Sequence, residues 1–247
     1  GGKGMSEITE KNEKYIDDVD MILSQDNDGA FEHNVNISRP DVSSAVVKRL
    51  PKYFRYLRQL IREGKTRVSS AELSKMMNVT ASQIRQDLNC FGGFGQQGYG
   101  YNVNYLYSKI CEILGVSFGF RAALVGAGNL GMALVKSPMF EKRGVDVVAM
   151  FDVNEEVIGK KVAGISVYSM DELERKLEEY GVHIVILTLP KECTEEVMAR
   201  LDGTRVRGVW NFTGTDIGIS KKGMAVENVH IGDSLMALCY EIAKDFE

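Results

Sequence analysis

The sequence has few cysteines, few histidines and no long apolar run, and each shortage excludes a class of protein. Its 247 residues include four cysteines, with no Cys-x-x-Cys pair and no spacing typical of a metal site. No run of about eighteen apolar residues is present, so we expect no membrane span, and no secretory signal is visible. These absences favour reduced thiols in a cytoplasmic protein that binds neither a metal nor a membrane.

Acidic residues outnumber basic ones, but the excess is uneven along the chain. The net charge is −4, yet residues 37–110 carry 12 basic and only 4 acidic residues. A basic segment inside an acidic protein is typical of nucleic-acid binding. Residues 1–36 are acidic and rich in asparagine and aspartate, so we expect a flexible tail, in which residues 1–4 are a cloning remnant before Met5.

The basic segment begins with a predicted helix from Asp41 to Glu63. Apolar residues recur three and four positions apart along one side of it, and basic residues occupy the other sides. Pro51 is expected to kink this helix or to start a second segment, because proline cannot donate the helical hydrogen bond. We expect contacts to DNA phosphates from four basic residues of this helix, Lys48, Arg49, Lys52 and Arg58.

Two shorter helices are predicted next. The stretch from Val68 to Leu73 begins the first, with Ser69 or Ser70 as its cap and Glu72 in capping-box range, and the helix ends near Met77. The second runs over residues 81–88 and follows a capping threonine. Two short helices joined by a tight polar turn form a helix-turn-helix, and the second helix of such a pair enters the major groove of DNA.

Residues 91–101 contain five glycines with aromatic residues between them. This composition indicates a β-hairpin wing, and the absence of a following Lys-Ser or Lys-Thr disfavours a phosphate-binding loop. We therefore predict a winged helix-turn-helix domain over residues 37–102. Beyond the basic residues of its first helix, the expected DNA contacts are Ser70, Thr80, Ser82, Gln83, Arg85, Gln86, Gln96, Gln97, Gly98 and Tyr99.

After a predicted linking helix over residues 103–120, the chain carries a strand, a glycine turn, a helix and a second strand. The apolar run 122–125 leads directly into the turn Gly126-Ala127-Gly128-Asn129-Leu130-Gly131. A helical pattern follows, and a second apolar run, 145–151, ends in Asp152. This succession is the dinucleotide-binding fingerprint in its usual context.

The chemistry of a dinucleotide explains these residue types. Gly126 permits the tight turn, Gly128 lets a pyrophosphate approach the backbone, and Gly131 allows close packing of helix on strand. The amino end of the helix offers free N–H groups to the phosphates. Asp152 can accept hydrogen bonds from the ribose hydroxyls and would repel a 2′-phosphate, so we predict NAD(H) rather than NADP(H).

Residues 121–231 alternate between strands and helices, which predicts an α/β protein with a Rossmann-like doubly wound parallel sheet. Further strands are expected near residues 165–168, 182–189, 206–210 and 224–231. A final amphipathic helix is expected over residues 232–247. Cofactor contacts come from the carboxyl ends of such strands. The residues nominated there are Thr188, Leu189, Pro190, Asn211, Phe212 and Thr213.

An NAD-dependent dehydrogenase is the competing hypothesis, and the sequence disfavours it. Only about sixteen residues follow the last expected strand, which leaves no room for a substrate domain. Of the three histidines, His33 lies in the tail and His183 begins a strand, so only His230 is placed for acid–base chemistry. We predict that the chain is not an enzyme and nominate no catalytic residue. A Rossmann domain that has lost its cofactor is the other alternative.

Taken in order, these motifs resemble the bacterial redox-sensing repressors of the Rex family. The resemblance runs from about Ile37 to the C-terminus and rests on the basic winged helix, the glycine-aromatic segment 91–101, the glycine turn and Asn211-Phe212-Thr213. It implies a homodimer that binds an inverted-repeat DNA operator. It also implies that NADH releases the operator while NAD⁺ permits binding, and that the C-terminal helix is swapped into the partner subunit.

The chain departs from the usual pattern of the family in its expected DNA contacts. Gln86 follows Arg85 where the family has a second basic residue, and Gln96 and Gln97 replace two basic residues of the wing. Arginine commonly reads guanine, whereas glutamine suits adenine. We therefore expect a half-site that keeps one G·C pair for Arg85 beside an A·T pair for Gln86, within an A·T-rich operator.

A second departure concerns the residues that report the redox state. The resemblance implies a network of an arginine, a tyrosine and an aspartate. Arg55 matches the arginine, but Ser137 stands where the tyrosine is expected and His230 where the aspartate is expected. Two hypotheses therefore stay open: a repressor that NADH releases from DNA, and a repressor that binds NAD(H) without the usual redox response.

Overall fold

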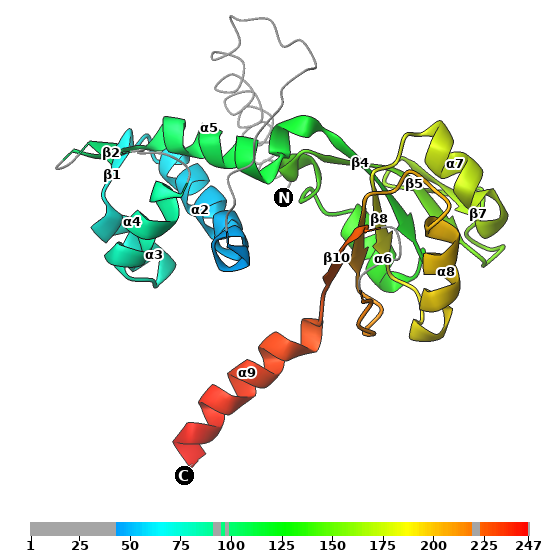
Figure 1. The fold of residues 1–247 in the computed structure, drawn as a ribbon. Helices are drawn as coiled ribbons and strands as arrows, with labels where there is room; N and C mark the ends of the chain where they lie inside the picture. Colours follow the sequence, from blue (N-terminus) through cyan, green and yellow to red (C-terminus); the bar gives the residue numbers. More distant parts are fainter. Residues whose placement is uncertain (1–42, 91–94, 97–98, 219–222, 247) are drawn as a thin grey trace, which may run out of the picture. The chain divides into compact units, whose positions relative to one another are not determined.

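The structure is a computed structural model that describes residues 43–90, 95–96, 99–218 and 223–246. The described residues divide into two compact units, the first ending at Gly115 and the second beginning at Val116 (Figure 1). No helix within the described ranges is long and apolar enough to cross a membrane. The predicted acidic tail, residues 1–36, lies outside the described residues.

The described part of the first unit contains four helices and a small antiparallel sheet. The helices are α2 (Ser44–Arg62), α3 (Ser70–Met77), α4 (Ala81–Asn89) and α5 (Val103–Leu114). The strands β1 (Arg67–Val68), β2 (Gly95–Gln96) and β3 (Gly100–Asn102) lie in the order β1-β3-β2. The strands β2 and β3 form the antiparallel hairpin that the glycine-rich segment predicted.

Local capping explains where α3 and α4 begin and end. Ser69 accepts the N–H of Glu72, and the Glu72 carboxylate accepts the N–H of Ser69, which is the predicted capping box. Asn78 ends α3 in the left-handed conformation, and Thr80 caps α4 by accepting the N–H of Gln83. Ser69 is therefore the predicted cap, and Val68 just before it belongs to β1, where it pairs with β3 in the wing sheet.

Two effects were predicted for Pro51, a kink or the start of a second segment. Helix α2 is a single continuous helix, so the second of these is wrong. Pro51 is exposed, while Leu50 and Phe54 on either side of it are buried. Burial of these neighbours holds both halves of the helix on one core despite the missing hydrogen bond. The ring of Phe54 stacks on Tyr107 of α5 at 5.3 Å, so the helix expected to link the domains packs within the first unit.

The described residues of the second unit include a seven-stranded sheet in the order β10-β9-β8-β4-β5-β7-β6. Its strands are β4 (Phe120–Val125), β5 (Val145–Asp152), β6 (Lys161–Val162), β7 (Ile165–Ser169), β8 (Ile184–Leu187), β9 (Gly208–Asn211) and β10 (Ala225–Asn228). All neighbours pair in parallel except β6, a two-residue edge strand that was not predicted. Strand β4 lies between β5 and β8, so the topological switch point falls beside β4.

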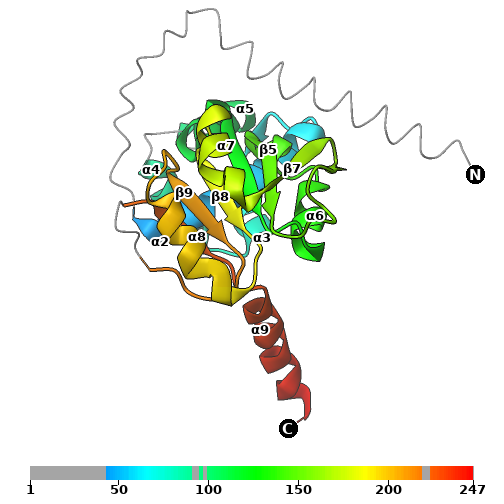
Figure 2. The same cartoon turned by 90° about the vertical axis from the view of Figure 1, so that its right-hand side faces the viewer.

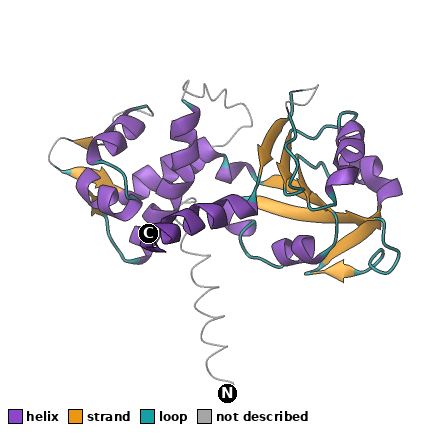
Figure 3. Cartoon of the chain, turned by 90° about the horizontal axis from the view of Figure 1, so that it is seen from below, coloured by secondary structure: helices purple, strands orange, loops and turns teal. Residues whose placement is uncertain are grey.

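Helices cover both faces of this sheet, as its doubly wound order requires (Figures 2 and 3). The covering helices are α6 (Asn129–Val135), α7 (Leu173–Glu179) and α8 (Thr194–Leu201). The last helix, α9 (Ile231–Ala243), has no buried residue and covers neither face. Short 3₁₀ turns span Val116–Phe118, Glu141–Arg143, Met170–Glu172, Lys191–Cys193 and Lys244–Phe246. The apolar residues of α7 and α8 share one core with the sheet, whereas Val135 of α6 belongs to the core on the opposite face.

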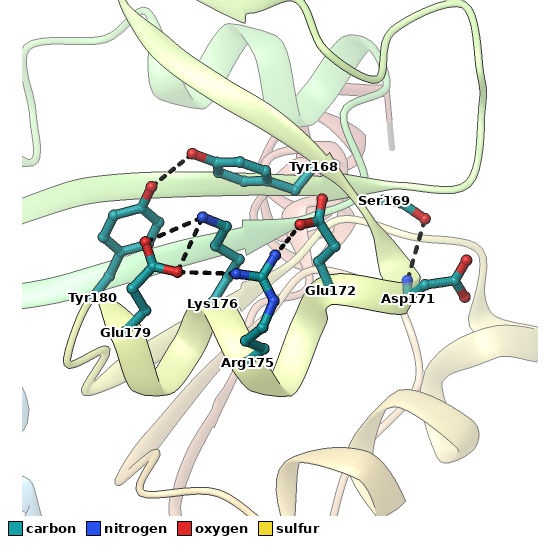
Figure 4. Close-up of polar contacts among 8 residues, drawn as sticks. All are labelled: Tyr168, Ser169, Asp171, Glu172, Arg175, Lys176, Glu179 and Tyr180. Carbon is teal, nitrogen blue, oxygen red and sulfur yellow. Dashed lines mark hydrogen bonds and ion pairs between the residues drawn. The ribbon is translucent and has the colours of Figure 1, made fainter.

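A polar cluster fastens α7 to the sheet edge (Figure 4). The hydroxyls of Tyr168 on β7 and Tyr180 lie 2.6 Å apart, and the Lys176 ammonium sits over both rings at 4.7 and 5.2 Å. Glu179 accepts from Lys176 and from Arg175. The cluster therefore stabilises the outer edge of the sheet, beyond β5.

Candidate nucleotide site and DNA-binding surface

The glycine turn between β4 and α6 has no room for side chains at two of its glycines. Gly126 has a φ of +102°, and a Cβ there would lie 2.6 Å from the carbonyl oxygen of Thr188. A Cβ on Gly131 would overlap the carbonyl oxygen of Gly126 and lie 2.8 Å from Thr188 Oγ1. The Thr188 hydroxyl donates to the Gly126 carbonyl at 2.7 Å. Thr188, at the end of β8, therefore holds the turn in place.

Gly128 differs from these two glycines because nothing lies within 4 Å of a Cβ built on it. It precedes α6, whose amino end has no side-chain cap. The next two residues, Asn129 and Leu130, are exposed. An uncapped amino end beside an open glycine is the arrangement that accepts a phosphate on backbone N–H groups.

Asp152 closes the end of β5 onto this turn. Its Oδ2 accepts the main-chain N–H of Ala127 at 2.6 Å, and its Oδ1 accepts the N–H of Asn154 at 2.8 Å. A carboxylate oxygen can accept more than one hydrogen bond, so both oxygens keep capacity for ribose hydroxyls. The predicted acid therefore also shapes the turn, a role that the sequence did not indicate.

Asn211, at the end of β9, is buried and fully hydrogen-bonded. Its amide donates to the carbonyl of Thr215 at 2.6 Å and to Asn228 Oδ1 at 2.8 Å, and its oxygen accepts the N–H and hydroxyl of Thr213. These bonds shape the loop after β9. The ring of Phe212 packs against Trp210 at 4.6 Å. The role of Asn228 was missed, since its partner is seventeen positions away in sequence.

The other cofactor candidates follow β8 directly. Leu189 is partly buried, and Pro190 is exposed. Strands β4, β5, β8 and β9 are parallel neighbours, so their carboxyl ends lie together. The glycine turn, Asp152 and the residues after β8 and β9 therefore meet at the carboxyl end of the sheet. Open α/β sheets bind nucleotides at this carboxyl end. Among the described residues, no cluster of His, Cys, Asp or Glu could hold a metal ion.

The expected recognition helix, α4, exposes Ser82, Arg85 and Gln86. Arg85 donates to the hydroxyl of Ser70 on α3 at 3.2 Å. Gln83 is turned toward its own helix, because its amide donates to Asp87 Oδ1 at 2.8 Å. Exposed arginine and glutamine on the second helix of a helix-turn-helix are the groups that read base edges.

The four expected phosphate contacts of α2 differ in their surroundings. Arg49 forms a bidentate ion pair with Asp87 of α4, at 2.7 Å for each bond. Lys52 donates to the carbonyl of Met77 at the end of α3, at 3.1 Å. Lys48 is exposed, and Arg58 is partly buried and has contacts of its own. Arg49 and Lys52 are therefore held by groups of the helix-turn-helix itself.

The described part of the wing adds one basic residue that sequence reasoning missed. Arg67 of β1 donates to the carbonyl of Tyr99 at 3.3 Å, and its guanidinium lies 5.9 Å from the centre of the Tyr99 ring. Tyr99 is 69% exposed. Two predicted contacts, Gln97 and Gly98, lie outside the described residues, as does the side chain of Gln96.

The three residues expected to report the redox state fall in different units. Arg55 is exposed on α2, with its guanidinium 5.2 Å from the ring of Tyr56. Ser137 is partly buried just after α6. His230 precedes α9, and its Nε2 lies 2.8 Å from Asp216 Oδ1. The hydrogen bond to Asp216 raises the pKa of His230 above its ordinary value of 6.5.

A helix-turn-helix unit followed by a nucleotide-type parallel sheet defines a ligand-controlled DNA-binding regulator. Two family models match, "Putative DNA-binding protein N-terminus" over residues 41–89 and "CoA binding domain" over residues 120–215. The redox-sensing transcriptional repressor Rex of Clostridium beijerinckii is 47% identical over 200 residues, which cover 81% of this chain and 94% of that protein. Its counterpart in Clostridioides difficile is 46% identical, over 83% of this chain and 97% of that protein. The chain therefore belongs to the Rex family of redox-sensing transcriptional repressors.

Solved structures agree with this assignment. The Rex-family repressor RSP in complex with β-NAD⁺ and operator DNA has a TM-score of 0.77 and 42% identity, over 83% of this chain and 94% of that one. RSP in complex with β-NADH gives a TM-score of 0.77 and 38% identity, over 83% and 96%. The predicted fold class and the prediction of a regulator instead of an enzyme are confirmed.

Proposed function

We propose that this chain binds an inverted-repeat, A·T-rich DNA operator as a homodimer in the cytoplasm and leaves it when NADH occupies the second unit. The observation that carries the proposal is the turn Gly126–Gly131. Two of its glycines have no room for a side chain, and the turn leads into an exposed helix end that has no side-chain cap. Such a turn suits a pyrophosphate and belongs to the same chain as an exposed recognition helix.

NAD(H) is the nucleotide that we propose for this turn. RSP, at 38–42% identity, has been solved with β-NAD⁺ and with β-NADH. In this chain the Asp152 carboxylate lies against the turn, where it would accept from the ribose hydroxyls and repel a 2′-phosphate. The contacts that we propose beyond the turn and Asp152 come from Thr188, Leu189, Pro190, Phe212 and Thr213. Asn211, also nominated from the sequence, has its amide fully hydrogen-bonded within the loop, so we propose that it positions Phe212 and Thr213.

The operator is proposed to be read by α4. RSP has been solved with operator DNA, which supports a DNA partner for this chain. Arg85 and Gln86 are exposed side by side on α4 and would contact base edges in the major groove. Phosphate contacts are proposed from Lys48 and Arg58, from Ser70 at the start of α3, from the cap Thr80 and from Ser82. Wing contacts are proposed from Gln96, Gln97, Gly98 and Tyr99.

A swapped α9 is the dimer contact that we propose. The helix carries large apolar residues that are exposed, including Leu235 at 61%, Met236 at 73% and Tyr240 at 66%. Contiguous exposed apolar surface of this kind marks a protein–protein contact. A second copy of the chain is the partner that an inverted repeat requires, because a two-fold operator matches a two-fold dimer.

Operator binding in the presence of NADH and of NAD⁺ tests the proposal. We expect titration with NADH to release a labelled operator duplex from the full chain, and equal concentrations of NAD⁺ to leave it bound. Equal effects of the two nucleotides would favour the second hypothesis, a repressor that binds NAD(H) without the usual response. That hypothesis is supported by the pairing of His230 with Asp216 inside the second unit.

A further inference from the structure

The recognition helix contains a carboxylate that is completely buried. Asp87 of α4 is 0% exposed, although it follows directly after the exposed Arg85 and Gln86. The Arg49 guanidinium donates from Nε to Oδ2 and from its terminal nitrogen to Oδ1, both at 2.7 Å. The Tyr53 hydroxyl donates to Oδ2 at 3.0 Å. With the bond from Gln83, both carboxylate oxygens accept two hydrogen bonds each.

These bonds keep Asp87 ionised inside the unit. Burial alone would raise the pKa of the Asp87 carboxyl, but hydrogen bonds from Arg49, Gln83 and Tyr53 outweigh it and lower the pKa below its ordinary value of 3.8. A buried carboxylate without its partners would be strongly unfavourable. The bidentate fork also requires the guanidinium and carboxylate to be nearly coplanar, which restricts rotation of α4 about its axis.

The partners of the helix-turn-helix lie on one side of α2. Arg49, Lys52 and Tyr53 are spaced by three and four positions, so they share one face of the helix. Arg49 and Tyr53 contact α4, whereas Lys52 donates a hydrogen bond to the carbonyl oxygen of Met77, the last residue of α3. This face of α2, which we call the clamp face (Arg49, Lys52 and Tyr53), therefore contacts both helices of the motif.

We propose that Arg49 and Asp87 are positioning residues for operator reading, and that Arg49 acts through Asp87 without contacting a DNA phosphate. The proposal rests on the proposed reading of the operator by α4. In a helix each residue is turned by about 100° from the one before it, so the direction of Asp87 toward α2 sets the directions of Arg85 and Gln86. If α4 were free to rotate about its axis, it would discriminate less between bases, while its charge would be unchanged.

The test compares Arg49→Lys with Lys48→Met. Lysine keeps the charge of Arg49 but cannot form the bidentate fork. The matched control, Lys48→Met, removes an exposed charge from the neighbouring position of the same helix. Fluorescence anisotropy would measure the affinity for the operator half-site selected by the parent chain and for duplexes with one base pair changed, each at several salt concentrations.

We expect Arg49→Lys to lower the ratio of operator to changed-duplex affinity by about tenfold, the discrimination of one bidentate base contact, with an unchanged salt slope. Lys48→Met should instead weaken binding to all duplexes alike and lower the salt slope by about 0.9. An Arg49→Lys variant that keeps the ratio of the parent would overturn the proposal. Failure of the parent to select any operator would instead refute the proposed function.

A double variant tests the same idea in case Arg49→Lys fails to fold. Arg49→Met combined with Asp87→Leu leaves no buried charge without a partner, a replacement that proteins often tolerate. Circular dichroism would confirm its fold. We expect reduced base discrimination with the salt slope of the parent. A slope reduced by about 0.9 with full discrimination would show that Arg49 contacts a phosphate and would overturn the proposal.

Discussion

The carboxylate of Asp152 accepts the main-chain N–H of Ala127 at 2.6 Å, across 25 positions of the sequence. This bond joins the carboxyl end of β5 to the glycine turn that follows β4. One side chain thus shapes the turn and is the group that we propose for the ribose. Its replacement should therefore disturb both the turn and the choice of nucleotide.

Replacing Asp152 by alanine should weaken NADH binding about tenfold or more and reduce the preference for NADH over NADPH. A lost hydrogen bond to a charged group costs about 1.5–3 kcal/mol, and the repulsion of a 2′-phosphate disappears with the carboxylate. Isothermal titration with both nucleotides measures this. The control is Asp146→Ala, an exposed acid on the same strand. Unchanged affinities for both nucleotides in Asp152→Ala would contradict the assignment.

Two alanine substitutions in the glycine turn should separate folding from binding. Gly131→Ala places a methyl group against the Gly126 carbonyl and Thr188, so we expect the free energy of unfolding to fall by about 1–3 kcal/mol. Gly128→Ala meets no neighbouring atom, so stability should be retained while NADH binding weakens. Denaturant unfolding and NADH titration of both variants check this. Equal stability of the two would show that the turn can relax.

The pairing of His230 with Asp216 predicts a dependence on pH. Because the pKa of the folded histidine is raised above 6.5, the stability from this pair is complete below pH 6.5 and is lost as pH rises through the raised value. We expect operator release by NADH to change between about pH 6 and 8. An NMR titration of the ring should give a lower pKa in Asp216→Asn. An identical titration curve in that variant would remove Asp216 as the cause.

Gln86 should determine one base pair of the operator. Glutamine pairs in bidentate fashion with adenine, whereas lysine prefers guanine. Selection from random duplexes should therefore give A·T at this position for the parent and a gain of guanine for Gln86→Lys. Arg85 should specify the adjacent G·C pair in both. The same half-site from both proteins would mean that Gln86 does not read the base.

Features encoded by neighbouring residues could be predicted from the sequence alone. The capping box of Ser69 and Glu72, the cap at Thr80 and the alternation of strands and helices depend on contacts within a few positions. The glycine turn is equally local, since its spacing reflects the tight bend between one strand and one helix. The fold class followed from these signals.

Contacts across long stretches of sequence were decided only by the tertiary structure. Arg49 was expected to contact phosphate, yet its partner Asp87 lies 38 positions away, on a helix whose orientation depends on packing. The short edge strand β6 and the continuity of α2 through Pro51 also depend on neighbouring elements. A sequence shows which side chains carry charge or hydrogen-bonding groups. Burial and the approach of distant elements decide which of those groups become partners, because an ion pair removed from water needs its counterpart in place.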